Sequence, residues 1–243
     1  IQAATAKVYR DTQFGELVEK YGMSIDLRGF PDYTVKVEMT GCEETAVPYI
    51  STKHLFVVLG EQKAGKSWIL LWHLLRLAFT GTKPAKVLYF YGEDEGSRID
   101  ENISILKKSM KIPNNSSGII KPINLAMASC VTPDGFDLKD RQCGEYLLGH
   151  IDKELAAFGE PPLVAVALDN YATLMGKNQS GDHAAVPALN LLGKIQQKGV
   201  AVLLACHTNA ELKTAGSIQI ERRANGIARV TKEPLWKEEI IRN

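Results

Sequence analysis

Cysteine is scarce in this chain, and its spacing argues against two kinds of site. The 243 residues include only four cysteines, Cys42, Cys130, Cys143 and Cys206. No two of them form a Cys-x-x-Cys pair, so the spacing of a zinc site is absent, and their low density argues against a disulfide framework. The pattern predicts a protein with reduced cysteines that works in the cytoplasm.

Long apolar runs and an excess of one charge are also lacking. The longest apolar run, Trp68 to Leu75, is broken by His73 and is too short to cross a bilayer, so we expect no membrane contact. Lys and Arg number 29 against 28 Asp and Glu, and this formal net charge of +1 excludes a strongly basic tail but not a local basic patch. Because the chain begins at Ile1 without a methionine, we expect a fragment or a processed form.

Two regions of different character follow one another along the chain. Residues 1–50 are mixed in composition, and we expect them to form an N-terminal flanking segment with an exposed strand near Val35–Met39. From residue 51 onward, short apolar runs alternate with helix-like stretches. The apolar runs are Leu55–Leu59, Val87–Tyr91, Leu163–Leu168 and Val200–Cys206, with a weaker one at Ile227–Thr231. The helix-like stretches are Ser67–Phe79, Ser97–Lys111, Lys139–Phe158 and Asp182–Lys198.

The four strong apolar runs indicate the fold class. None of them alternates apolar with polar residues, so both faces of each strand should be covered, as happens in parallel sheets. Strands of this kind, alternating with helices, are typical of a layered domain. The sequence therefore predicts an α/β fold with a mostly parallel central sheet and helices on both faces.

A phosphate-binding loop is predicted between the first apolar run and the first helix. Residues 60–67, Gly-Glu-Gln-Lys-Ala-Gly-Lys-Ser, match the pattern Gly-x-x-x-x-Gly-Lys-Ser/Thr at every fixed position. Such a loop directs backbone N–H groups at phosphate oxygens, and the helix N-terminus adds further donors. We expect Lys66 to reach the β- and γ-phosphates of ATP and Ser67 to coordinate Mg²⁺. The predicted nucleotide-binding residues are Gly60, Glu61, Gln62, Lys63, Ala64, Gly65, Lys66, Ser67 and Trp68.

Asp169 is the candidate for a second magnesium-binding residue. It ends the run 163–168, and the carboxyl ends of parallel strands meet at the edge of the sheet where ligands bind. An aspartate that caps the next helix would give the same pattern. The following residue is Asn170 rather than the glutamate that many P-loop enzymes carry, so the catalytic base must come from elsewhere.

Glu93 is the candidate for that base. It follows the run 87–91 at another strand end, where a carboxylate can orient or deprotonate the water that attacks the γ-phosphate. The alternative is an acidic turn in which Asp94 or Glu95 caps the next helix. His207, at the end of the run 200–206, is the candidate for hydrogen bonding to the γ-phosphate or the water. A histidine that only completes its hydrogen bonds at a strand end is the alternative.

Taken together, these residues resemble the RecA-like P-loop ATPases, most closely the RepA branch, which comprises a hexameric plasmid replicative helicase and its AAA-type relatives. The matching segments are Gly60–Ser67, Tyr91–Asp94, Leu168–Asp169, Ala205–His207, Gly216–Ser217 and Asn225–Val230. They span most of the chain, and the resemblance implies a RecA-like ATPase domain over residues 51–243. It also implies that Glu93 is the catalytic base and His207 the γ-phosphate sensor.

The resemblance implies Mg²⁺-dependent ATP hydrolysis by a ring- or filament-forming protein that acts on DNA, as a helicase or as a replication or recombination ATPase. The implied partners are ATP or ADP, single-stranded DNA and copies of the same chain, as in a hexameric ring. The alternative is a nucleotide-switched regulatory or assembly ATPase that does not translocate DNA. The loop after His207 favours that alternative, because it is short and Lys213 is its only cation. A small-molecule kinase is disfavoured, because no Arg-rich lid segment follows the phosphate loop.

Arg229 is predicted to act across a subunit boundary. It interrupts the apolar segment 227–230, where an unpaired guanidinium would be costly to bury, so we expect an exposed edge or an interface. By resemblance, this strand carries an arginine finger that reaches the γ-phosphate of the next subunit. Arg222 and Arg223 are alternative fingers, and a local ion pair between Arg229 and Glu233 is the structural alternative.

Overall fold

The computed structural model describes residues 23–26, 34–35, 47–48, 53–79, 84–93, 96–113, 116, 118–157, 161–176, 185–208 and 218–232. Of the flanking segment it describes three short strands, β1 (Met23–Asp26), β2 (Thr34–Val35) and β3 (Val47–Pro48). β2 pairs with β3 in an antiparallel ladder. The strand predicted near Val35–Met39 is therefore described only at its first residue, and its remainder lies outside the described residues.

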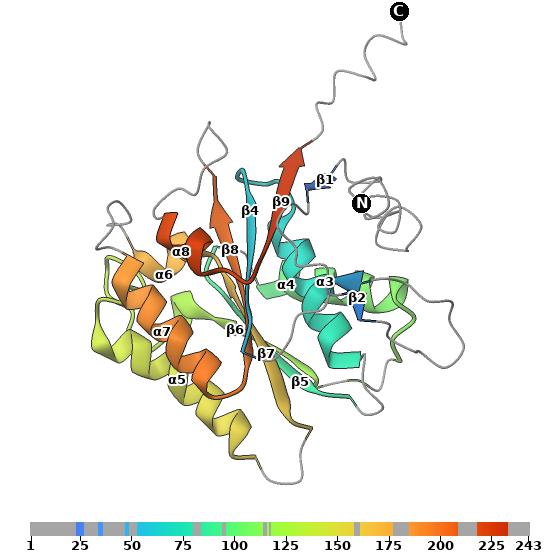
Figure 1. Cartoon of the computed structure of the whole chain (residues 1–243). Coiled ribbons are helices and arrows are strands. Elements are labelled where there is room, and N and C mark those ends of the chain that lie inside the picture. Colours follow the sequence, from blue (N-terminus) through green and yellow to red (C-terminus); the bar gives the residue numbers. More distant parts are fainter. Residues whose placement is uncertain are drawn as a thin grey trace, which may run out of the picture.

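A seven-stranded sheet forms the centre of the fold (Figure 1), in the order β1-β9-β4-β8-β7-β5-β6. The six strands from β9 to β6 are parallel to one another, and only β1 is antiparallel, against β9. Their bounds are β4 Leu55–Gly60, β5 Lys86–Tyr91, β6 Ile120–Asn124, β7 Leu163–Asp169, β8 Ala201–His207 and β9 Gly226–Lys232. The predicted α/β fold with a mostly parallel sheet is confirmed.

Helices cover both faces of this sheet (Figure 1). Their bounds are α3 Lys66–Phe79, α4 Gly96–Ser109, α5 Arg141–Leu155, α6 Tyr171–Met175, α7 Val186–Gln197 and α8 Ile218–Arg223, with a 3₁₀ turn η1 at Leu125–Met127. One core packs α3 and α4 against the sheet, and the other packs α5, α6 and α7. The sequence of β4 does not alternate apolar with polar residues because both faces of the strand are buried. Val57 and Leu59 enter one core, while Phe56 and Val58 enter the other. Across the described segments, no helix has both the length and the hydropathy needed to cross a bilayer.

The sequence prediction missed β6 and the short helices α6 and α8, and it placed the start of α5 two residues too early. Strand β6 was not predicted, because Lys121 and Pro122 interrupt its apolar pattern. It lies at the edge of the sheet, where a proline is tolerated. Helix α5 begins at Arg141 rather than Lys139, because the Asp140 side chain accepts a hydrogen bond from the N–H of Gln142 and caps the helix there.

Candidate active site

The phosphate loop joins β4 to α3 at the carboxyl edge of the sheet. Lys63 and Gly65 have positive φ angles of 62° and 93°, which curl the backbone between strand and helix. Gly60 packs closely against the neighbouring strand β9, because a Cβ on Gly60 would come within 2.7 Å of the carbonyl oxygen of Val230. The first glycine of the motif is therefore needed for close packing of β9, and the second for the turn.

Lys66 folds back onto this loop. Its Nζ donates hydrogen bonds to the carbonyl oxygens of Gly60 at 3.0 Å and Glu61 at 2.7 Å, and it lies 3.2 Å from Nδ1 of His207. An ammonium group has three donors and no acceptor, so Nδ1 of His207 accepts here. Burial lowers the pKa of Lys66, and the nearby carboxylates of Asp169 and Glu93 oppose that effect.

Glu93 and Asn170 lie on the other side of the His207 ring. Nε2 of His207 is 3.1 Å from the amide nitrogen of Asn170 and 3.9 Å from Oε1 of Glu93. The pKa of Glu93 is lowered, chiefly by His207; burial acts against this, while Asn170 and Lys66 add to it. Glu93 is therefore held as a carboxylate, the form that a base for water requires.

Asp169 lies buried at the end of β7, in contact with a tyrosine. The hydroxyl of Tyr89 donates a hydrogen bond of 2.5 Å to Oδ2 of Asp169. The next helix, α6, is capped by Asn170 instead, whose Oδ1 accepts from the N–H of Thr173 at 3.1 Å. The residue that caps this helix is therefore Asn170 and not Asp169.

The carboxylate of Asp169 and the hydroxyl of Ser67 fit the oxygen ligands that Mg²⁺ prefers. Within the described part of the chain, no group of three or more His, Cys, Asp or Glu side chains could hold a metal ion. An ion at this edge would therefore take most of its ligands from phosphate oxygens and water, as Mg²⁺ in nucleotide sites does.

Comparison with known protein families identifies the family of this chain. A family model described as an AAA domain matches residues 45–211, which is more than half of the chain. The chain belongs to the AAA domain family. It is a P-loop ATPase, an enzyme that binds and hydrolyses ATP. The chain matches none of the curated proteins with which it was compared.

Four predicted site residues of this AAA domain, Lys66, Glu93, Asp169 and His207, come together at one edge of the sheet. Trp68 is partly buried and packs against the α3 core. Asp94 and Glu95, the alternative carboxylates, lie outside the described residues. Sequence reasoning missed the contacts of Asn170 and Tyr89; Asn170 stood out only as a departure from the usual glutamate.

The setting predicted for Arg229 is corrected in one respect. Strand β9 is not an edge strand, because β1 pairs with its outer side. The backbone of Arg229 lies opposite Asp26 on one side and Leu59, just before the phosphate loop, on the other. Its side chain is outside what the structure describes.

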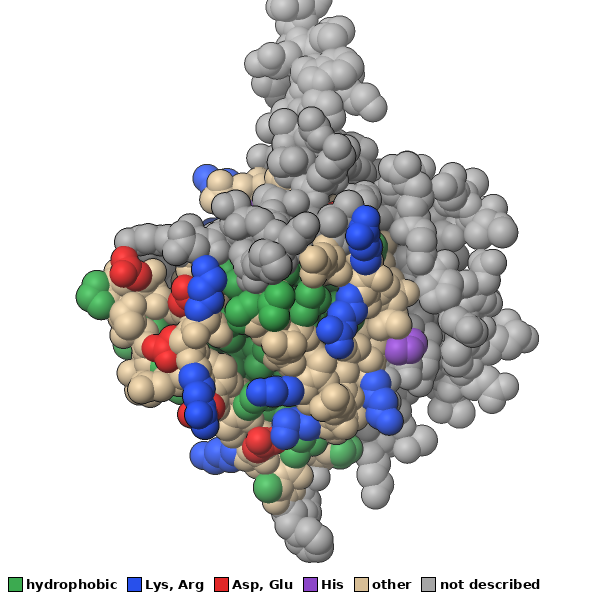
Figure 2. Space-filling model, turned by 60° about the vertical axis from the view of Figure 1, so that its left-hand side comes forward, with side chains coloured by type: hydrophobic (Ala, Val, Ile, Leu, Met, Phe, Trp, Pro, Cys, Tyr) green, Lys and Arg blue, Asp and Glu red, His purple; other side chains and the backbone are tan. Residues whose placement is uncertain are grey.

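Other cations of the AAA domain are exposed on the side formed by α5 to α8. Figure 2, in which that side of Figure 1 comes forward, shows Lys and Arg side chains around a hydrophobic patch. The exposed cations of α7 and α8 include Lys194, Arg222 and Arg223. The guanidinium of Arg223 lies over α7, since a Cβ on Gly193 would be 3.0 Å from its Nη2. Asp and Glu side chains lie among these cations in the same view, so this face carries several exposed cations rather than a continuous basic patch.

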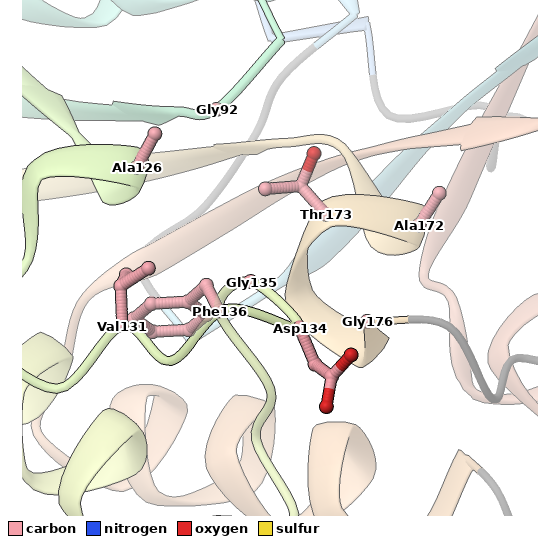
Figure 3. A pocket seen from close by; sticks show the side chains of 9 residues that line it. All are labelled: Gly92, Ala126, Val131, Asp134, Gly135, Phe136, Ala172, Thr173 and Gly176. Carbon is pink, nitrogen blue, oxygen red and sulfur yellow. The ribbon is translucent and has the colours of Figure 1, made fainter.

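A pocket of about 220 Å³ opens beside Gly92, the residue before Glu93 (Figure 3). It is lined by Gly92, Ala126, Val131, Asp134, Gly135, Phe136, Ala172, Thr173 and Gly176. The side chain of Thr173 points from α6 toward Gly92. Because the N–H of Thr173 is bonded to Asn170, this wall of the pocket is continuous with the contacts of His207.

Gly92→Ala should lower the free energy of unfolding by about 1–3 kcal/mol, the usual cost of overpacking. A Cβ at this position would overlap Cγ2 of Thr173 and lie 3.3 Å from its Oγ1. Urea unfolding measures the change. Adding Thr173→Ser removes Cγ2 and should restore most of the loss. Gly144→Ala on α5 is the control, because nothing lies within 4 Å of its added Cβ and alanine favours helix. Equal effects of Gly92→Ala with and without Thr173→Ser would contradict the contact.

Proposed function

We propose that this ATPase hydrolyses Mg²⁺-ATP within a ring or filament of identical chains that acts on DNA, as a RepA-type helicase or a replication or recombination ATPase. The observation that carries the hydrolytic part of the proposal is the convergence of Lys66, His207 and Glu93 within one set of contacts. We assign the catalytic unit to residues 51–243, to which the flanking segment contributes β1.

Nucleotide binding should change the contacts of Lys66. Charged phosphate oxygens are stronger acceptors than the carbonyls of Gly60 and Glu61, so Nζ should leave them for the β- and γ-phosphates. That movement releases Nδ1 of His207, which then faces the γ-phosphate side of the site. In this proposal, the neutral ring then changes tautomer, so that Nδ1 donates to the γ-phosphate and Nε2 accepts from the amide of Asn170, and His207 thereby senses whether the γ-phosphate is present.

Hydrolysis then depends on the carboxylates. Ser67 and Asp169 would hold Mg²⁺, which neutralises charge on the phosphates when bound. Glu93 orients and deprotonates the attacking water from the side opposite the leaving group. The contact of His207 with Asn170 links this step to α6, because Asn170 also caps that helix.

The DNA-directed role is supported by the exposed cations near α7 and α8, which can contact a phosphate backbone. A regulatory or assembly ATPase without translocation is the second candidate, and the single cation of the loop after His207, Lys213, favours it. A cytoplasmic setting is proposed from the cysteines, since Cys130, Cys143 and Cys206 are free and buried.

Lys66→Ala should reduce ATP turnover by about 10²–10³-fold, because it removes the cation that offsets charge on the β- and γ-phosphates in the transition state. Steady-state ATPase assays check this, with Lys108→Ala, an exposed α4 lysine, as the control. Wild-type turnover in Lys66→Ala would contradict the phosphate-loop assignment.

The same assay, run with and without single-stranded DNA, separates the two candidate functions. A DNA-acting ATPase should be stimulated by single-stranded DNA, and the stimulation should fall steeply as salt increases. Turnover that is independent of DNA at low salt would support the regulatory candidate instead. Lys66→Ala, measured alongside, shows how much of any DNA-dependent signal comes from this site.

A further inference from the structure

Tyr89 lies at the centre of β5 and is fully buried, yet its hydroxyl needs a hydrogen-bond partner. That partner is Oδ2 of Asp169, at 2.5 Å. A distance this short is typical of a hydroxyl that donates to a charged carboxylate. The bond joins two neighbouring strands at the edge where the phosphate loop lies.

The register of β5 and β7 determines how Tyr89 reaches Asp169. Tyr89 lies opposite Ala167, and Tyr91 lies opposite Asp169, so the tyrosine side chain must extend along β7 to reach the carboxylate. Ala165 and Ala167 both face the α3 core, as Tyr89 does, and their small side chains leave room for its ring. The ring of Tyr91 stacks on that of Tyr89 with centroids 5.9 Å apart.

We propose that Tyr89 is a positioning residue for the magnesium ligand Asp169. A carboxylate that accepts a hydrogen bond at one oxygen from a buried, stacked ring cannot rotate freely, so the direction of its other oxygen is fixed as well. Partners that orient a metal ligand in this way typically contribute about 10–100-fold to metal affinity or activity. The inference rests on the proposed function, since it assumes that Asp169 takes part in holding Mg²⁺.

A positioning role differs from a purely structural one in what it changes. If the hydroxyl of Tyr89 only satisfies a buried carboxylate, its loss should alter stability and affect nucleotide binding equally with and without metal. If it orients Asp169, its loss should weaken the metal-dependent part of binding alone. The phosphate loop should still bind nucleotide without metal, because its backbone N–H groups and Lys66 bind the phosphate oxygens directly.

The experiment compares Tyr89→Phe with Tyr91→Phe in the full chain. Each variant loses one hydroxyl from neighbouring stacked rings of β5, but that of Tyr91 lies near Gly96 at the start of α4. Mn²⁺ affinity in the presence of ADP is measured by electron paramagnetic resonance, and ADP affinity is measured in EDTA. We expect Tyr89→Phe to weaken Mn²⁺ binding by about 10-fold, with ADP affinity in EDTA unchanged. Tyr91→Phe should match the wild type in both measurements.

Combination with Asp169→Asn tests whether Tyr89 acts through that carboxylate. In the Asp169→Asn background, Tyr89→Phe should cause no further loss of Mn²⁺ affinity, because the carboxylate that Tyr89 orients is already gone. Additive losses would overturn the proposal, as would equal Mn²⁺ affinities of Tyr89→Phe and Tyr91→Phe. A Tyr89→Phe chain that fails to fold would also overturn it, by showing that the hydroxyl serves stability. A wild-type chain that binds ADP but no Mn²⁺ would instead contradict the proposed metal site.

Discussion

Glu93→Gln should reduce ATP hydrolysis by about 10²–10⁴-fold and leave nucleotide affinity close to that of the wild type. Glutamine keeps the size of the side chain and its capacity for hydrogen bonding, but it cannot accept a proton from water. The surrounding polar groups, His207 first among them, hold the pKa of Glu93 below the usual value, which keeps the side chain ionised but makes it a weaker base. At neutral pH, the wild-type side chain is therefore fully ionised and available as a base.

Single-turnover hydrolysis separates this effect from binding, and the affinity for ADP is measured in parallel. The matched controls are Asp94→Asn and Glu95→Gln, which remove the two carboxylates next along the chain. If one of these controls loses hydrolysis while Glu93→Gln keeps it, the base is a different carboxylate. If Glu93→Gln loses ADP affinity as well, the residue supports binding rather than proton transfer.

The fold was predictable where one physical rule decided the structure. Strands β4, β5, β7 and β8 are buried on both faces, so their apolar runs are continuous and stand out from the helices. β6 escaped prediction because Lys121 and Pro122 are acceptable only at the edge of the sheet. The pairing of β1 with β9 joins segments about 200 residues apart, and no local pattern contains that information.

The positions of the candidate site residues were predictable for a similar reason. Lys66 follows from a motif with a known backbone geometry, and Glu93, Asp169 and His207 follow from the rule that parallel strands bring their carboxyl ends to one edge. The contacts between these residues were not predictable. The bond from Tyr89 to Asp169 depends on the register of two strands and on the length of a tyrosine side chain. The capping role of Asn170 was hidden because either it or Asp169 could have begun α6.

Arg229→Ala should lower ATP hydrolysis by about 10³–10⁵-fold in an assembly of identical chains, because a guanidinium supplied by one subunit would neutralise transition-state charge in the next. The backbone of Arg229 lies in β9 opposite Leu59, at the edge of the sheet that carries the phosphate loop. Head-to-tail contacts place the same edge of each subunit against a different surface of its neighbour. In such an assembly we expect this arginine to reach the neighbouring site, and the mixing of variants tests that against action within its own subunit.

Mixing two inactive variants tests the transfer directly. Lys66→Ala chains lack a working phosphate loop but keep the arginine, and Arg229→Ala chains have the opposite defect. When they co-assemble in equal amounts, about a quarter of the interfaces join an intact loop to an intact arginine, so partial hydrolysis should return. Arg222→Ala and Arg223→Ala, mixed with Lys66→Ala in the same way, show whether either exposed α8 arginine is the finger instead. Full activity of Arg229→Ala alone, or no recovery despite proven co-assembly, would remove Arg229 from the mechanism, because a residue that acts only in trans must be both necessary and able to complement.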